Sequence, residues 1–273
     1  MYSGTTLTKM SGRVMGAHQK IDRISRRHLA IITGYTNHFP AIKDILHFEG
    51  KNGPDGIKRK SPARDEPWHF YSPFNDADAG LPELIQQHYR LLVKHLKSSN
   101  SERAAFEAAW LAHALVDGLT PAHHYPYEDK LVELRGDGND SRTTIKEKLV
   151  MPGENRRAKV KNNWKMWGPK GLFTTHSMFE LGIASIIKPI TFSDASPSED
   201  EIRKMQELGV VEWFKRTARE IAVLDMYDRY YRRGWSTKLT VDVRQKLIPS
   251  ITKTVTLAWY AALQDAGLAQ KIK

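Results

Sequence analysis

The stretch that decides the fold runs from Ala104 to Tyr127 and reads AAFEAAWLAHALVDGLTPAHHYPY. Its helical part, as far as Leu119, is apolar on nearly every helical face. A helix without a polar face is a buried helix. The sequence therefore predicts an all-α protein with this helix at its centre, and Ser101 is a plausible N-cap for it.

Apolar residues recur at helical spacing in several other places, whereas strand patterns are weak throughout. The pattern predicts further helices over residues 16–33, 81–96, 174–187, 199–232 and 242–266. Residues 48–79 are rich in Gly, Pro and Asp and predict a long ordered loop. The segment 128–171 is polar, basic and interrupted by Gly and Pro, so we interpret it as an insertion with one short helix. A length of 273 residues fits a single domain, 1–273, that carries this insertion.

Composition excludes several classes of site. There is no cysteine, so disulfides, thiolate nucleophiles and cysteine-rich zinc sites are ruled out, and any metal must use nitrogen and oxygen ligands. No run approaches the ~20 apolar residues of a membrane-spanning helix. The first residues, MYSGTTLTKMSGRVMGAHQK, lack the apolar stretch of a secretory signal. We therefore expect a cytoplasmic protein, or a secreted one if a leader was removed.

The charge favours anionic partners. The formal net charge is +11, which suits nucleic acid, acidic lipid surfaces or phosphate-bearing substrates, or serves solubility alone. Within the insertion, residues 156–173 read RRAKVKNNWKMWGPKGLF. Cations interleaved with tryptophans are typical of a peripheral contact with an acidic membrane. They also suit single-stranded nucleic acid, where bases stack on aromatic rings, or a solvated loop whose tryptophans pack on the domain.

Two predicted helices carry a histidine and a carboxylate four residues apart. His113 and Asp117 share one face of the central helix, and His176 and Glu180 share a face of another apolar helix. A buried carboxylate is unfavourable unless it is paired or binds a metal. A simple buried His–Asp hydrogen bond is the alternative for the first pair, but His123, six residues after Asp117, extends it to H-x3-D-x5-H. Two such helices can build a multi-metal site between them.

Two further histidines are candidates. His69 lies among aromatic residues in PWHFYSPF, fourteen residues after Asp55. It is either a metal ligand or an aromatic-packed loop histidine. His18 lies on the inward-facing side of the first predicted helix. It is either a metal ligand or, as is more common at such a position, a core histidine whose ring nitrogens are hydrogen-bonded.

The run HALVDGLTPAH resembles the zinc-binding core of the zinc-dependent phospholipases C and the related single-strand-specific zinc nucleases. The resemblance extends in order from His18 to Glu180 and implies a multi-helix, all-α domain with two or three zinc ions. It implies one zinc held by Asp55, His69, His113 and Asp117, a second held by His123, His176 and Glu180, and a third held by His18 with Asp117 bridging. It further implies a zinc-dependent phosphoric ester hydrolase in which a metal-bound water attacks the phosphorus. Asp55 would orient or deprotonate that water.

The chain departs from this family in two ways. The family's third zinc is also chelated by an N-terminal tryptophan, whereas this chain begins with Met1, so we expect the third zinc to be weak or absent. The gap between His123 and His176 is long, which leaves His124 and Glu128 as alternative ligands. Glutamate at position 180 and the run HFYSP favour a phospholipase C-like enzyme acting on an anionic phosphoester such as a phospholipid. A zinc nuclease, or a non-catalytic helical zinc-binding protein, is the alternative.

Overall fold

The structure is a computed structural model that describes residues 1–3, 16–35, 38–57, 69–136 and 144–269. All regular secondary structure in these ranges is helical, with no β-strand, so the predicted all-α class is confirmed there. In chain order the helices are α1 (Ala17–Ile32), α2 (Ile42–His47), the 3-10 turn η1 (Gly50–Asn52), α3 (Pro54–Ile57), α4 (Gly80–Lys97), α5 (Ser101–Gly118), the 3-10 turn η3 (Pro121–His124), α6 (Tyr127–Arg135), α7 (Ile145–Leu149), α8 (Arg156–Trp167), α9 (Leu172–Ile187), α10 (Glu199–Leu208), α11 (Val210–Ala222), α12 (Met226–Arg233), α13 (Thr237–Asp242), the π-helical turn η5 (Val243–Leu247) and α14 (Ile248–Asp265).

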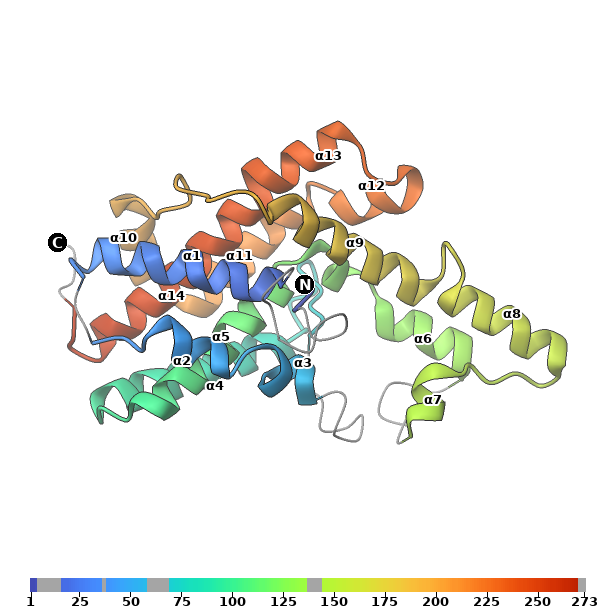
Figure 1. Ribbon diagram of the computed structural model, residues 1–273, viewed down its shortest axis with the longest axis horizontal. Coiled ribbons are helices and arrows are strands. Elements are labelled where there is room, and N and C mark those ends of the chain that lie inside the picture. Colours follow the sequence, from blue (N-terminus) through green and yellow to red (C-terminus); the bar gives the residue numbers. More distant parts are fainter. Residues whose placement is uncertain (4–15, 36–37, 58–68, 137–143, 270–273) are drawn as a thin grey trace.

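Helix α5, the predicted central helix, packs against α1, α2, α4 and α14 (Figure 1). It is buried along almost its whole length. Helix α14 is equally buried, and the two are joined where the indole nitrogen of Trp259 donates to the Ala108 carbonyl at 3.1 Å. The N-cap of α5 is Asn100, whose side chain accepts from the Arg103 amide at 3.1 Å, so the prediction of Ser101 as the cap is wrong.

Several predicted boundaries are also wrong. The single helix predicted over 199–232 is three helices, because the backbone takes positive φ angles at Gly209 (+77°) and Asp225 (+52°), which no α-helix accommodates. The helix predicted over 242–266 consists of the π-helical turn η5 and α14, and α13 precedes it. The predicted loop at 48–79 contains the short helices η1 and α3, and the structure does not describe residues 58–68 of it.

The predicted insertion contains α6, α7 and α8 rather than one short helix. These helices extend from one end of the molecule, at the right of Figure 1, and α9 leads back from them to the central helices. They have a small apolar core of their own, made by Tyr127, Leu131, Met151 and Met166.

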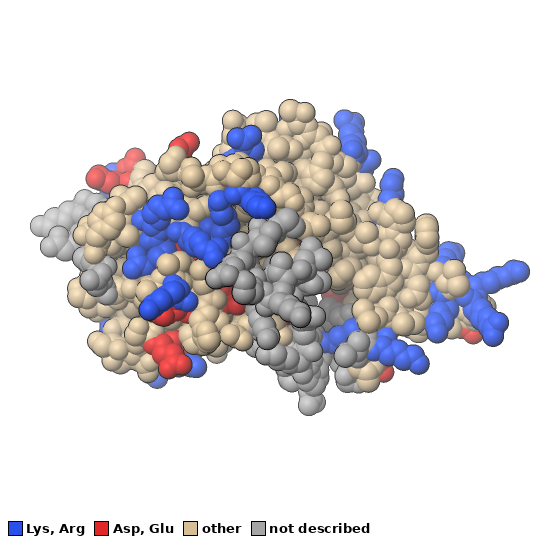
Figure 2. Space-filling model, in the orientation of Figure 1, with Lys and Arg blue, Asp and Glu red and all other residues tan. Residues whose placement is uncertain are grey.

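Basic side chains gather in two places on the face shown in Figure 2, over α1 and at the end formed by α7 and α8. In the described part of the chain, no helix is both long enough and apolar enough to cross a membrane.

Candidate metal centre

Asp117 is at the centre of a cluster of histidines, and its two carboxylate oxygens face different ones. Oδ2 lies 2.6 Å from Nδ1 of His69 and 3.2 Å from Nε2 of His113. Oδ1 lies 3.1 Å from Nε2 of His18 and 3.7 Å from Nε2 of His123. Because His113 and Asp117 are one turn apart on buried α5, the helix itself holds these two side chains next to each other.

The structure brings all eight predicted ligands into three groups. In each group one ligand atom per residue lies within 4.8 Å of the others, a spacing that suits a shared metal ion. The groups are His18, His113 and Asp117; Asp55, His69 and His113; and His123, His176 and Glu180. The first two groups share His113, and Nε2 of His123 in the third lies 3.7 Å from Oδ1 of Asp117 in the first, so the three groups form one cluster.

The cluster draws on segments far apart in the sequence. Helix α1 carries His18, α3 carries Asp55, and α9 carries His176 and Glu180. Glu180 Oε1 lies 2.8 Å from His123 Nε2 and 3.0 Å from His176 Nε2. Asp55 Oδ1 lies 3.9 Å from Nε2 of His113.

The residues of the cluster differ in their access to solvent. The side chains of His18, His113 and Asp117 are at most 2% exposed, whereas that of Asp55 is 18% exposed. Glu180 and His176 are also partly accessible. Asp55 and the two α9 residues are therefore the more accessible of these side chains.

Hydrogen bonds fix which nitrogen two of the histidines turn toward the cluster. His123 uses Nδ1 to donate to the His69 carbonyl at 2.8 Å, and His113 uses Nδ1 to donate to Glu49 Oε1 at 2.8 Å. Both leave Nε2 facing the carboxylates. His113 Nε2 and both ring nitrogens of His18 are buried without a hydrogen bond. Buried polar atoms rarely lack a hydrogen-bond partner, and coordination of a metal ion would give these nitrogens one. The donor set therefore fits a metal.

Glu49 is a functional candidate that the sequence did not reveal. It precedes η1, is buried, and reaches His113 across 64 residues of sequence, so no local pattern signals it. A carboxylate behind a metal-binding histidine orients the ring and raises its basicity. Asp22 lies nearby on α1, one turn after His18. Burial, and then the charge of Glu49, raise the pKa of Asp22 well above its ordinary range.

Charges within the cluster compensate one another. Burial alone would raise the pKa of Asp117, but the Met1 amino group and the histidines around it hold that pKa well below its usual value. For Glu180, burial is likewise outweighed by Met1 and His176, and its pKa is also low. Both carboxylates are therefore ionised at neutral pH and available as ligands.

The backbone nitrogen of Met1 is the unexpected member of the cluster. It forms an ion pair with Asp117 and lies 3.2 Å from Glu180 Oε1 and 3.3 Å from His123 Nε2. The segment is tied to α1, where the Ala17 amide donates to the Tyr2 carbonyl at 2.8 Å. The expectation of a weak third zinc rests on the absence of a donor here. In its ion pair with Asp117 the Met1 nitrogen is an ammonium, which has no electron pair for a metal until it loses a proton.

The alternative ligands lie outside the groups. His124 donates from Nε2 to the Gly118 carbonyl at 2.8 Å, and burial lowers its pKa to about 4. Neither it nor Glu128 belongs to a group among the described residues.

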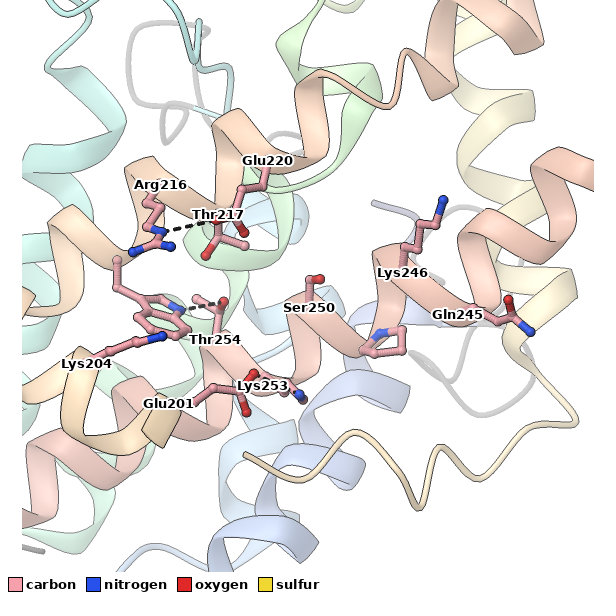
Figure 3. A pocket seen from close by; sticks show the side chains of 12 residues that line it. Glu201, Lys204, Arg216, Thr217, Glu220, Gln245, Lys246, Ser250, Lys253 and Thr254 are labelled. Carbon is pink, nitrogen blue, oxygen red and sulfur yellow. Dashed lines mark hydrogen bonds and ion pairs between the residues drawn. The ribbon is translucent and has the colours of Figure 1, made fainter. Parts of the chain in front are cut away.

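A cavity of about 420 Å³ lies elsewhere, between α10, α11 and α14 (Figure 3). Four of its charged side chains form two pairs, Lys253 with Glu201 at 2.8 Å and Arg216 with Glu220 at 3.1 Å. None of the eight clustered residues lines it. The histidine and carboxylate cluster and this cavity are therefore separate features of the molecule.

Comparison with protein-family models finds no match, and comparison with curated proteins finds no similar sequence. The functional assignment therefore depends on the residues themselves.

Proposed function

We propose that the chain is a zinc-dependent phosphoric ester hydrolase, similar to the phospholipases C. The observation that carries the proposal is the position of Asp117. Its two oxygens face separate sets of histidine nitrogens, as a carboxylate that bridges two metal ions does. The absence of cysteine and the mixture of imidazole and carboxylate donors suit zinc.

Each of the three groups would hold one zinc ion. Asp55, His69, His113 and Asp117 would hold one zinc, and His123, His176 and Glu180 a second. His18 and Asp117, with the Met1 nitrogen nearby, would hold a third. When bound, zinc lowers the pKa of its water towards ~7 and polarises the phosphoryl oxygens.

The protein's own groups position the reactants. Asp55 is the more solvent-exposed carboxylate at the mouth of the cluster, so it can hold the attacking water and accept its proton. The buried histidines on α5 and α1 fix the ligand geometry. The partly exposed His176 and Glu180 on α9 lie where a phosphate group would enter.

The proposal is tested by metal analysis together with hydrolysis. Purified protein should contain at least two zinc ions per chain and should cleave bis-p-nitrophenyl phosphate, with activity lost to a chelator and restored by zinc. Asp117→Asn should lose both metal and activity, since it removes the charge that faces His18, His69, His113 and His123.

A second assay identifies the substrate by comparing the cleavage of phosphatidylcholine with that of single-stranded DNA. Cleavage of the lipid supports a phospholipase C-like enzyme, and cleavage of DNA alone would make the protein a nuclease on the same scaffold. Zinc binding without hydrolysis of any ester would contradict the proposal and indicate a non-catalytic metal protein.

A further inference from the structure

The end of the molecule formed by α6, α7 and α8 has a surface that the metal centre does not explain. Between Glu154 and Glu180 the sequence contains no acidic residue but has six cations, at positions 156, 157, 159, 161, 165 and 170. All six side chains are exposed, and none forms an ion pair with a described residue. Figure 2 shows such basic side chains at this end of the molecule. The charge is therefore available to an anionic partner.

Large apolar side chains lie among these cations. Val160 is 70% exposed and Trp164 is 67% exposed. They are one turn apart on α8, so they lie on one face of the helix. Arg157 and Lys161 occupy the same face, three residues before each of them. Helix α8 buries Met166 against the small core instead, so this stripe faces away from the protein.

We propose that the stripe Arg157, Val160, Lys161 and Trp164 docks the protein onto an anionic membrane surface. An interfacial helix inserts its apolar side chains at headgroup level while its cations contact acidic lipids. Single-stranded nucleic acid fits less well, because its binding proteins combine a basic groove with successive stacking aromatics. Here a single exposed tryptophan has an aliphatic neighbour, which adds nothing to base stacking but adds apolar area in a bilayer.

The docking surface is joined to the metal centre. Helix α9 begins five residues after α8 ends, and the Thr174 hydroxyl donates to the Trp167 carbonyl at 2.9 Å. The rings of Trp167 and Phe173 are in contact, with centroids 4.8 Å apart. Helix α9 then carries His176 and Glu180 into the cluster. Membrane binding itself does not require the hydrolase activity, but its use in presenting a lipid to the cluster rests on the proposed function.

The test is co-sedimentation of the full chain with vesicles of phosphatidylserine and phosphatidylcholine in equal parts, and with vesicles of phosphatidylcholine alone. We expect binding to the anionic vesicles. Arg157→Gln combined with Lys161→Gln should weaken it about 30-fold, since each surface cation contributes about fivefold. Trp164→Ala should weaken it about tenfold, because the inserted apolar area is lost.

Matched controls separate this surface from general charge attraction. Arg23→Gln with Arg27→Gln removes two exposed cations at the same spacing on α1, and Tyr35→Ala removes a similarly exposed aromatic side chain. Both should bind as the wild type does, and all variants should keep the wild-type circular dichroism and zinc content. Equal weakening by the α1 pair would overturn the proposal. Failure of the wild type to bind anionic vesicles would also overturn it, as would dependence on Trp164 seen only with a single-stranded oligonucleotide.

Discussion

Glu49→Gln tests whether the carboxylate behind His113 supports metal binding. In the wild type, Glu49 Oε1 lies 2.8 Å from Nδ1 of His113. Glutamine keeps an oxygen that can accept this hydrogen bond but removes the negative charge of the carboxylate. Both side chains are at most 2% exposed, so water cannot replace that charge. Loss of such a supporting partner lowers metal affinity about 10- to 100-fold. This corresponds to about 1.4–2.7 kcal/mol of metal-binding free energy.

The chain offers a matched control on the same central helix. Glu107, on α5, accepts from Nδ1 of His88 at 2.7 Å, and this pair is also buried. No metal group among the described residues includes His88. Glu107→Gln should therefore lower the free energy of unfolding without changing zinc affinity.

The assay is competition for zinc against a chelating dye, combined with thermal unfolding of metal-free protein. We expect Glu49→Gln to shift the zinc affinity and Glu107→Gln to shift only the unfolding temperature. Wild-type zinc affinity in Glu49→Gln would refute the role assigned to Glu49. An equal loss of affinity in both variants would show that the effect comes from general loosening of α5.

Three further predictions concern other parts of the structure. His18→Ala should lower turnover more than total zinc, measured by metal analysis and ester hydrolysis, because it removes a ligand of one group only. Gly182→Ala should destabilise the protein by about 1–2 kcal/mol in urea denaturation: an added Cβ would lie 2.3 Å from the rigid Trp235 ring, and overpacking outweighs the gain in helix propensity. A variant as stable as the wild type would contradict this. Asp242→Asn should lose about 1–3 kcal/mol at neutral pH, where the bonds from two cations hold the pKa of Asp242 below its ordinary 3.8 despite partial burial. That difference should shrink as the pH falls below about 4, since the wild-type carboxylate is then protonated as well.

The sequence predicts what is encoded locally. Helix α5 is recognisable because a buried helix needs no polar face, so its sequence is apolar on nearly every side. Its histidine and aspartate are one turn apart and therefore visible as a local pattern. Glu49 is hidden because its contact with His113 spans 64 residues. Helix α8 is missed because only Met166 among its twelve residues is buried, so no apolar periodicity develops. The break at Asp225 is missed because a left-handed non-glycine residue leaves little trace in the sequence.

Together, the two proposals predict that Trp164→Ala affects the hydrolysis of membrane substrates but not of soluble ones. A soluble ester reaches the cluster directly, so Trp164→Ala should leave its hydrolysis unchanged. Hydrolysis of phosphatidylcholine in anionic vesicles should fall about tenfold in the same variant, because less enzyme is on the surface. Glu49→Gln should lower both rates to a similar extent when zinc is limiting, since it acts on the metal centre and leaves α8 unaltered. Both activities are measured by release of the phosphorylated product at equal enzyme concentration. If Trp164→Ala slows the soluble reaction as much as the vesicle reaction, then α8 acts on the metal centre through α9, and the separation of docking from chemistry is wrong.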